Sequence, residues 1–379
     1  MACIPTPPLL DFALDIYRHI QAEHASDKGN IFCSPLSIAV ALAMTVAGAR
    51  GNTADEIMSA MRVQHDFPIH RHLSELVKDF KKFTADVTLH MANRIFLEKE
   101  FTPLPEFSKL LHDSYDTTSV SVDFRHAADQ CRQQINLWVH EATKGKIQDL
   151  LPPGMLDEFT RLVIVNAVYF KGLWDKKFDP IATKEMDFHE TRSTSRKVEM
   201  MFQKGKFRTS RCDDLKVSCL ILPYKGNDVA MALLLPDDIE GLSSLEASLT
   251  AEKFTSLVFG AESGHNVSVW LPKFKVEHAT ALKSVLRKMG MNQAFGMQAD
   301  LTGISARNDL QVSEVVHKAF VEVNEEGTEA AAATAVVVRM KRCLELFEEV
   351  DFKADHPFMF AIILVESQVV LFMGSLRRP

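Results

Sequence analysis

The sequence lacks the short motifs that mark most enzymes and metal sites. It contains no HExxH, no phosphate-binding P-loop, no GxGxxG and no GxSxG nucleophile elbow. Its six cysteines include no CxxC pair, and none has the histidine spacing of a zinc site. We therefore expect no enzymatic activity, no metal site and no catalytic residue of its own.

The chain also has little that would suit a membrane or a nucleic acid. Its formal net charge of −7 argues against general nucleic-acid binding. Residues 31–49 carry no charge, but they include a proline and several hydroxyl groups, which favours a buried helix over a membrane span. The N-terminus has no basic segment followed by an apolar core, so we do not expect a signal peptide there.

Low-complexity linkers and internal repeats are absent, and 46% of the 379 residues are hydrophobic. We therefore predict one domain spanning residues 1–379. Helical spacing predicts helices within residues 9–20, 36–46, 62–83 (beyond Pro68) and 131–142. After residue 160, apolar runs rich in β-branched side chains predict strands at 162–170, 217–223, 229–236, 267–276, 358–365 and 369–373. The order of helices first and strands later is typical of an α+β fold.

Residues 325–343, EEGTEAAAATAVVVRMKRC, form the most informative segment. None of the even-numbered residues from Thr328 to Met340 is charged, whereas Glu329, Arg339 and Lys341 are odd-numbered. Because alternate side chains of a β-strand point to opposite faces, this segment can enter a sheet with one face free of charge. Its basic end suits recognition by another molecule, so the segment suggests a conformational switch.

Several motifs then resemble the serpin family in the same order along the chain. They are NIFCSPLSI at 30–38, NAVYFKGLW at 166–174, LPKF at 271–274, HKAFVEVN at 317–324 and ADHPF at 354–358. The resemblance runs from about residue 12 to residue 379, and the short N-terminus resembles ovalbumin-type serpins or mature secreted arthropod serpins. It implies an α+β fold with three β-sheets, eight to nine helices and an exposed reactive-centre loop, here residues 325–343.

The resemblance also implies roles for residues of the loop. By the family's loop length, the scissile bond is Lys341–Arg342, although Arg342–Cys343 is equally basic and one position away. The hinge through which the loop would enter the sheet comprises Glu325, Glu326, Gly327, Thr328, Glu329, Ala330, Ala331, Ala332 and Ala333.

Two further clusters follow from the resemblance. Trp174, Lys273 and Glu325 resemble the breach, where insertion starts, and a Lys273–Glu325 ion pair is expected there. The shutter, a polar cluster beneath the sheet that lets the strands part, is implied for Ser34, Ser37, Asn166 and His317.

The implied function is inhibition of a serine protease, which attacks the loop and is trapped as an acyl-enzyme when the loop inserts. The basic end of the loop favours trypsin-like proteases as partners, and we expect a monomer. Two alternatives stay open: a non-inhibitory serpin acting as carrier or chaperone, and an inhibitor of cysteine proteases.

Other features carry weaker predictions. Arg71, Lys78, Lys81 and Lys82 form either an ordinary solvated helix face or a site for a sulfated glycosaminoglycan such as heparin; we expect no other cofactor. Asn266-Val267-Ser268 is a glycosylation sequon. A basic reactive bond suits extracellular proteases, so we expect a secreted protein whose leader is absent from this chain, with cytoplasmic residence as the alternative.

Overall fold

The computed structural model describes residues 7, 9–24, 29–64, 66–80, 86–328 and 349–379. Its helices are α1 (Leu10–Glu23), α2 (Pro35–Gly48), α3 (Gly51–Ala60), α4 (Ile69–Phe80), α5 (Pro105–Tyr115), α6 (Phe124–Ala142), α7 (Leu242–Ser248), α8 (Ala251–Phe254) and α9 (Leu282–Lys288). Short turns of other helix types lie at Pro180–Ala182, Thr255–Phe259 and Gln293–Phe295. None of the helices within these ranges has the length and apolar character needed to cross a bilayer.

Within the described ranges the strands form two sheets. They are β1 (Ile31–Cys33), β2 (Val87–Glu98), β3 (Ser119–Val122), β4 (Leu162–Leu173), β5 (Lys184–Thr191), β6 (Thr194–Cys212), β7 (Val217–Pro223), β8 (Val229–Pro236), β9 (Glu262–Pro272), β10 (Phe274–Ala281), β11 (Glu314–Val323), β12 (Gly327–Thr328), β13 (Glu349–Lys353), β14 (Phe358–Leu364) and β15 (Val369–Leu376).

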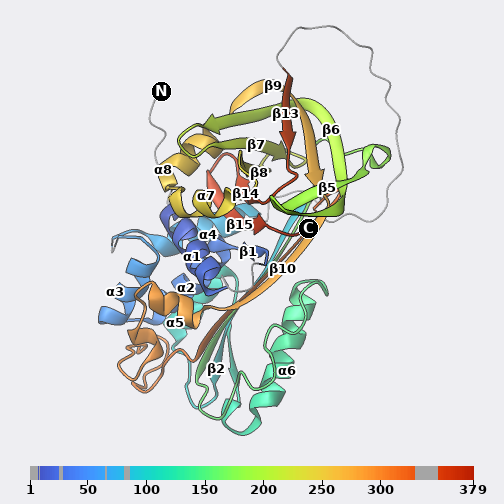
Figure 1. The fold of residues 1–379 in the computed structure, drawn as a ribbon. Coiled ribbons are helices and arrows are strands. Elements are labelled where there is room, and N and C mark those ends of the chain that lie inside the picture. The colour runs from blue at the N-terminus through green and yellow to red at the C-terminus, as the bar shows by residue number, and fades with distance from the viewer. Residues whose placement is uncertain (1–6, 8, 25–28, 65, 81–85, 329–348) are drawn as a thin grey trace.

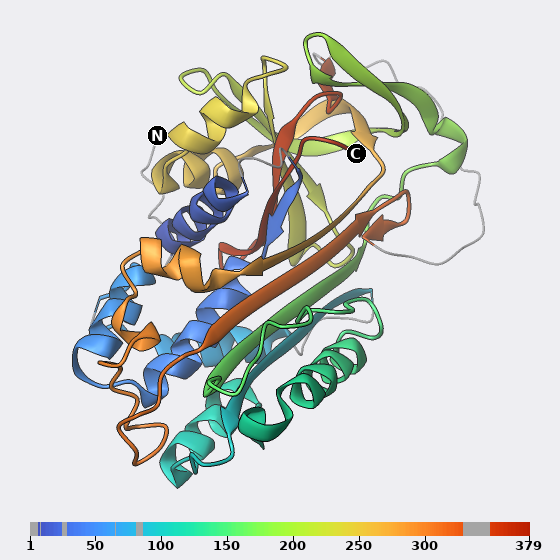
Figure 2. The ribbon, with the colours of Figure 1, turned by 60° about the horizontal axis from the view of Figure 1, so that its bottom comes forward.

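The six-stranded sheet has the order β10-β11-β12-β4-β2-β3, and it packs against helices on both faces (Figures 1 and 2). Its central strand β4 is apolar along most of its length, as a strand covered on both sides should be. Ile164 and Val168 of β4 belong to the main core, whereas Val163 and Val165 belong to a second apolar cluster under α6. The alternation of side chains thus divides the core into two layers.

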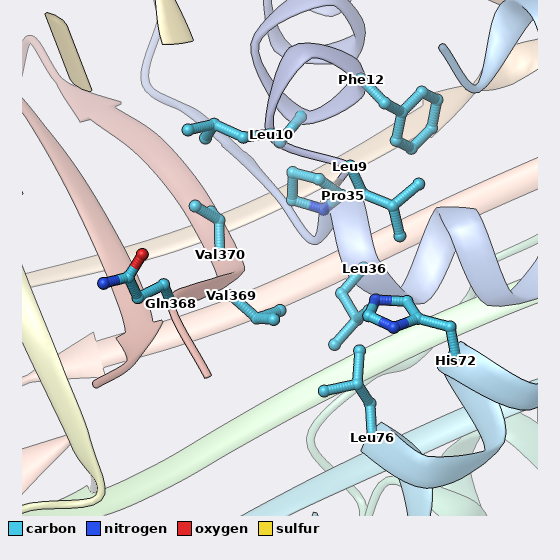
Figure 3. A pocket seen from close by; sticks show the side chains of 11 residues that line it. Leu9, Leu10, Phe12, Pro35, Leu36, His72, Leu76, Gln368, Val369 and Val370 are labelled. Carbon is cyan, nitrogen blue, oxygen red and sulfur yellow. The ribbon is translucent and has the colours of Figure 1, made fainter. Parts of the chain in front are cut away.

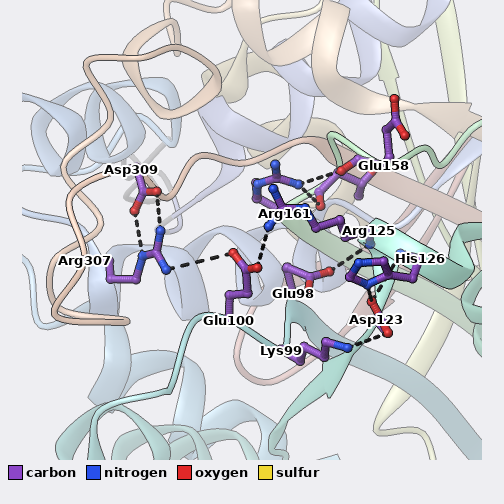
Figure 4. A network of polar contacts seen from close by, with 11 residues as sticks. Glu98, Lys99, Glu100, Asp123, Arg125, His126, Glu158, Arg161, Arg307 and Asp309 are labelled. Carbon is purple, nitrogen blue, oxygen red and sulfur yellow. Dashed lines mark hydrogen bonds and ion pairs between the residues drawn. The ribbon is translucent and has the colours of Figure 1, made fainter.

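Helix α6 lies on one side of this sheet, opposite α1 to α5 (Figure 1). Its start is held by carboxylates, as Figure 4 shows: the backbone N–H of His126 donates to Asp123 Oδ1 at 3.2 Å, and that of Arg125 donates to the buried Glu98 at 3.2 Å. Lys99 Nζ pairs with Asp123 at 2.5 Å. Acceptors at a helix start satisfy its unpaired N–H groups, so the sequence around 98–126 fixes where α6 begins.

The nine-stranded sheet follows the path β1-β15-β14-β8-β7-β6-β9-β13, with β5 pairing to β6 outside it. The resemblance implied three sheets. Here β6 is a single strand of 19 residues that pairs with β7 near its end and with β9 and β5 along the rest. The strands of the implied third sheet are therefore joined to this sheet by hydrogen bonds along one continuous strand.

Helix α2 is the most buried helix and supports the six-stranded sheet from below. Ser34 caps it by accepting a hydrogen bond from the Ser37 N–H, and Pro35 occupies its first turn, where a missing N–H costs nothing. Between α1, α2, α4 and the start of β15 the side chains leave a cavity of only about 10 Å³ (Figure 3). Helices α1, α2 and α4 are thus closely packed against β15 at this point.

Several element predictions are confirmed and one needs correction. Strands β7 and β8 begin and end at the residues predicted from their apolar runs. The helix predicted beyond Pro68 begins at Ile69. Strands β1, β2 and β3 precede residue 160, where the sequence predicted only helices; β2 carries His90, Asn93 and Arg94 and so lacks a strand-like apolar pattern.

Candidate functional site

A short strand lies at the upper end of the seam between β4 and β11. There β12 pairs with both neighbours: Thr328 lies opposite Val323 of β11 and Gly172 of β4. Below this point β4 and β11 pair directly and in parallel, from Glu314 opposite Val163 to Phe320 opposite Tyr169. Residues 327–328 thus occupy the first position of a seam that is otherwise closed.

Gly327 makes this position possible. Its φ of +149° is one that L side chains rarely adopt, and a Cβ there would lie 2.1 Å from the carbonyl oxygen of Gly172. The clash would be with backbone, which cannot move away without breaking the pairing of β4. Only glycine therefore lets the chain turn from β11 into the seam at this point.

Thr328 points into the core and is fully buried. Its hydroxyl lies 2.7 Å from the hydroxyl of Tyr224, whose ring stacks on Trp174 at 4.5 Å between centroids. Gly172 allows this arrangement, because a Cβ there would come within 2.8 Å of the Tyr224 ring. Sequence reasoning did not select Tyr224, which follows strand β7 and belongs to none of the family motifs used.

The predicted breach residues come together around the loop's first residues. Lys273 Nζ lies 3.3 Å from Glu325 and 3.2 Å from Glu199, so the expected Lys273–Glu325 ion pair is confirmed. Trp174 donates from its indole N–H to the Asn324 carbonyl at 2.9 Å. Together these contacts fasten the segment before Gly327 to the upper end of the sheet.

Hydrogen bonds keep Glu325 ionised. Burial alone would raise the pKa of its carboxyl, but hydrogen bonds from its own backbone N–H, Thr183 and Lys273 outweigh burial and lower that pKa. The Thr183 hydroxyl donates to Glu325 Oε1 at 2.9 Å.

The four predicted shutter residues form one buried network beneath the seam. The backbone N–H of Ser34 donates to His317 Nε2 at 3.1 Å, so Nε2 is the acceptor and Nδ1 carries the proton that is donated to Asn166 Oδ1. The Asn166 amide donates to the Ser37 carbonyl at 2.9 Å. Burial, with a smaller contribution from His278, lowers the pKa of His317 to about 3.

Asn93 of β2 is a fifth member of the network that sequence reasoning missed. Its Oδ1 accepts from Ser37 Oγ at 3.2 Å and from the Asn166 amide. The network therefore joins the two strands of the seam, β4 and β11, to their neighbours β2 and α2. A lone asparagine within a strand that was not predicted offered no signal for this role.

The remaining predicted residues are less informative here. Arg71 is exposed on α4 and pairs with Glu75 at 2.9 Å, and Lys78 lies in the last turn of the same helix. Asn266 is half-buried in β9. No group of His, Cys, Asp and Glu within the described ranges is arranged to hold a metal ion. The residues that lie outside the described ranges are Lys81, Lys82, Glu329, Ala330, Ala331, Ala332, Ala333, Lys341 and Arg342.

Comparison with known proteins agrees with this architecture. The family model of serpins, described as serine protease inhibitors, matches residues 9–379. "Iris" of Ixodes ricinus is 50% identical over 369 residues, and "Leukocyte elastase inhibitor" of Sus scrofa is 44% identical over 373 residues; both alignments cover 97% of each chain. The crystal structure of uncleaved ovalbumin superposes with a TM-score of 0.89 at 33% identity, covering 99% of each chain.

The chain belongs to the serpin family, and the predicted α+β serpin fold is confirmed. The family is one of protease inhibitors rather than of catalytic enzymes. The target protease and the mechanism of inhibition have to be inferred from the residues of this chain.

Proposed function

We propose that this serpin inhibits its target as a suicide substrate. The observation that carries the proposal is the position of Gly327–Thr328 at the first place of the seam between β4 and β11. The first residues of the loop already pair with both β11 and β4. If the following residues pair in the same way, the loop becomes a further strand between them. The Ser34–Asn166–His317 network beneath the seam supports a route along which these strands part.

The burial of Thr328 supports the predicted orientation of the inserted strand. If the strand continues, every even-numbered residue after Thr328 points toward the same interior face. Those residues are small as far as Thr334 and uncharged as far as Met340, whereas Glu329, Arg339 and Lys341 would point to the other face.

The proposed reaction replaces one peptide bond of the loop with one ester bond to the protease. The serine Oγ of the protease attacks the carbonyl carbon of the reactive residue, the peptide bond breaks, and the new amine departs with the C-terminal fragment. The N-terminal arm stays joined to the protease as an ester. Insertion of that arm adds about ten backbone hydrogen bonds at ~1 kcal/mol each, which is enough to hold the protease in a distorted, trapped state.

We propose a trypsin-like target and a reactive bond at Lys341–Arg342, with Arg342–Cys343 as the neighbouring alternative. A basic side chain suits a pocket that contains a carboxylate. A second candidate is an elastase-like protease, because one relative is named for leukocyte elastase and Val336, Val338 and Met340 are apolar. A cysteine protease and a non-inhibitory role are further outcomes of the same test.

The test is to mix the purified protein with trypsin, thrombin, plasmin, leukocyte elastase and a cathepsin. An SDS-stable band at the summed mass, with sequencing of the released C-terminal fragment, identifies both target and bond. Cleavage by every protease without such a band would contradict inhibition. A band with elastase alone would replace the trypsin-like target.

Thr328→Arg tests the insertion step. The guanidinium would have to enter the buried site beside Tyr224, so we expect cleavage at the same bond without a stable complex. Glu329→Arg is the matched control, because the neighbouring side chain belongs to the charged face of the strand. If Thr328→Arg traps the protease as well as the control does, insertion is not the mechanism.

We also propose that residues 1–379 fold as one domain and that the protein is an extracellular monomer. A single cooperative unfolding transition tests the first point. Detection in secretions rather than in cell lysate tests the extracellular location.

Glycosylation is tested separately. A mass loss on glycosidase treatment that Asn266→Gln abolishes would assign a glycan to Asn266. Retention on heparin that falls when Arg71, Lys78, Lys81 and Lys82 are replaced by alanine tests the polyanion site.

A further inference from the structure

Phe159 exposes a large apolar side chain to water just before β4 begins. The residue is 68% exposed, although its neighbours Leu156 and Thr160 are buried. A single exposed apolar side chain is ordinary on a protein surface. What distinguishes this one is the rigid turn that presents it.

Asp157 and Thr160 build that turn with hydrogen bonds in both directions. Asp157 Oδ1 accepts from the backbone N–H of Phe159 at 2.9 Å and from the Thr160 hydroxyl at 3.0 Å. The backbone N–H of Asp157 donates to Thr160 Oγ1 at 3.0 Å. The Arg161 guanidinium adds a bond to the Glu158 carbonyl at 2.9 Å, as Figure 4 shows. A ring held on such an ordered backbone loses little conformational entropy when a partner covers it.

The register of β12 relates this turn to the reactive loop. Thr328 lies opposite Gly172 and the pairing is antiparallel, so the two residue numbers of each pair add up to 500. A strand that continues in this register has Val338 opposite Leu162, the first residue of β4. The inserted strand and β4 therefore leave the sheet at the same end.

The proposed reactive residue lies close to this end of the sheet. Lys341 is three residues beyond Val338, and Phe159 is three residues before Leu162. Three extended residues span at most about 10 Å. The carbonyl carbon that carries the protease would thus lie within a short tether of the turn, and it would do so for Arg342 as well.

We propose that Phe159 is a contact for the trapped protease, with its ring against an apolar patch beside the protease's reactive serine. This inference rests on the proposed function, because only an inserted loop brings the protease to this end of the sheet. Aromatic residues, phenylalanine included, are enriched at the buried centre of protein interfaces. The partner is the acylated protease because the length of the inserted arm leaves it beside this turn.

The contact acts on the lifetime of the trapped state. The complex is lost when water attacks the ester, which restores the serine hydroxyl of the protease and leaves a carboxylate on the reactive residue. Hydrolysis needs an ordered active site, and a short tether alone would let the protease turn away from the sheet and recover that order. Phe159 holds the protease in the position to which insertion has pulled it, and so slows hydrolysis.

The test measures release of active protease from the trapped complex, using the protease that gives the SDS-stable band in the mixing experiment. Phe159→Ser should release it at least about tenfold faster than the unaltered chain, whereas Phe159→Leu should stay within about threefold. Ile181→Ser is the matched control. Ile181 is 80% exposed and its N–H donates to Asp179 Oδ1 at 2.9 Å, but it lies near Thr183 at the other end of the sheet, so release should not change.

Binding before cleavage provides a second measurement. A protease whose reactive serine is replaced by alanine binds the intact loop without cutting it, so its Kd should be the same for Phe159→Ser and the unaltered chain. The Tm of the variant should also be unchanged, because the ring is exposed.

Equal release rates for Phe159→Ser and Ile181→Ser would overturn the contact, and so would weaker binding of the alanine-substituted protease to Phe159→Ser. If no protease forms a stable complex, the proposed function fails and the contact fails with it. If a stable complex forms and Phe159→Ser releases it at the rate of the unaltered chain, the contact alone is wrong.

Discussion

Two glycines and one threonine decide what the hinge can do. Gly172 leaves room for the Tyr224 ring, Gly327 lets the chain turn into the seam, and Thr328 satisfies the Tyr224 hydroxyl. None of these side chains reacts with anything. Their contribution is to place the start of the loop where a strand can grow.

Gly327→Ala should lower the free energy of unfolding by roughly 2–4 kcal/mol, because it combines an unfavourable φ with a backbone clash. Gly264→Ala is the matched control: φ there is +107°, but no atom lies within 4 Å of the added Cβ, so only about 1–2 kcal/mol should be lost. Denaturant titration gives both values. Equal losses would show that the contact between Gly327 and Gly172 does not matter.

Buried histidines should make the protein less stable in mild acid. The pKa of His317 is about 3 and that of His278 about 4, both mainly through burial, whereas an unfolded histidine titrates near 6.5. Stability is therefore complete above pH 6.5 and falls as the pH decreases toward 4, because the unfolded chain takes up protons that the folded chain excludes. Each histidine contributes up to ~1.4 kcal/mol per pH unit.

Denaturant titrations at several pH values measure this slope. His317→Gln and His278→Gln should each make it shallower, whatever they do to stability at neutral pH. An unchanged slope in both variants would mean that other groups cause the acid sensitivity.

At the scale of elements, helix α6 lies on one face of the six-stranded sheet (Figure 1). Its Ile135 and Val139 belong to an apolar cluster that also contains residues of β2 and of the two strands of the seam, β4 and β11. Asn136 holds the following loop by two hydrogen bonds to the backbone of Leu151, at 3.0 and 2.9 Å. Helix and loop thus form one lid on this face of the sheet.

Asn136→Leu should lower the free energy of unfolding by about 2 kcal/mol, because it leaves the buried N–H of Leu151 without a partner and leaves its C=O with the Arg132 guanidinium alone. Gln133→Leu, one turn earlier, removes only a surface hydrogen bond to Asp129 and should cost less than about 0.5 kcal/mol. Thermal unfolding of both variants tests the difference. Similar losses would mean that the Leu151 contacts are not what holds the lid.

Elements whose apolar residues follow one clear pattern could be predicted from the sequence. Elements in which polar residues interrupt that pattern could not. The β7–β8 hairpin has two apolar runs around a turn sequence, so its bounds follow directly. Strand β2 has one face in the core and one face under α6, so apolar residues are expected on both faces. Asn93 and Arg94 place a polar residue on each face and interrupt that pattern. The breach and shutter residues were found through family resemblance, whereas Tyr224 and Asn93 become visible only once distant strands are placed side by side.

At the scale of the whole molecule, the fold pairs two strands directly that could instead accept a further strand between them. Strands β4 and β11 pair directly in parallel, which is slightly weaker per residue than antiparallel pairing. A loop strand inserted between them would be antiparallel to both, as β12 already is. If the proposed insertion takes place, it therefore exchanges parallel pairing between β4 and β11 for antiparallel pairing with the new strand on both sides.

Cleavage at the reactive bond should therefore raise stability rather than lower it. About ten new backbone hydrogen bonds at ~1 kcal/mol each predict a rise in Tm of at least ~10 °C for the cleaved chain, with both fragments still associated. Calorimetry before and after limited trypsin digestion measures this rise. Thr328→Arg, cut at the same bond, should show little or none, because the strand cannot start beside Tyr224. A cleaved wild-type chain with unchanged Tm would mean that the small, uncharged face of residues 328–340 does not enter the sheet.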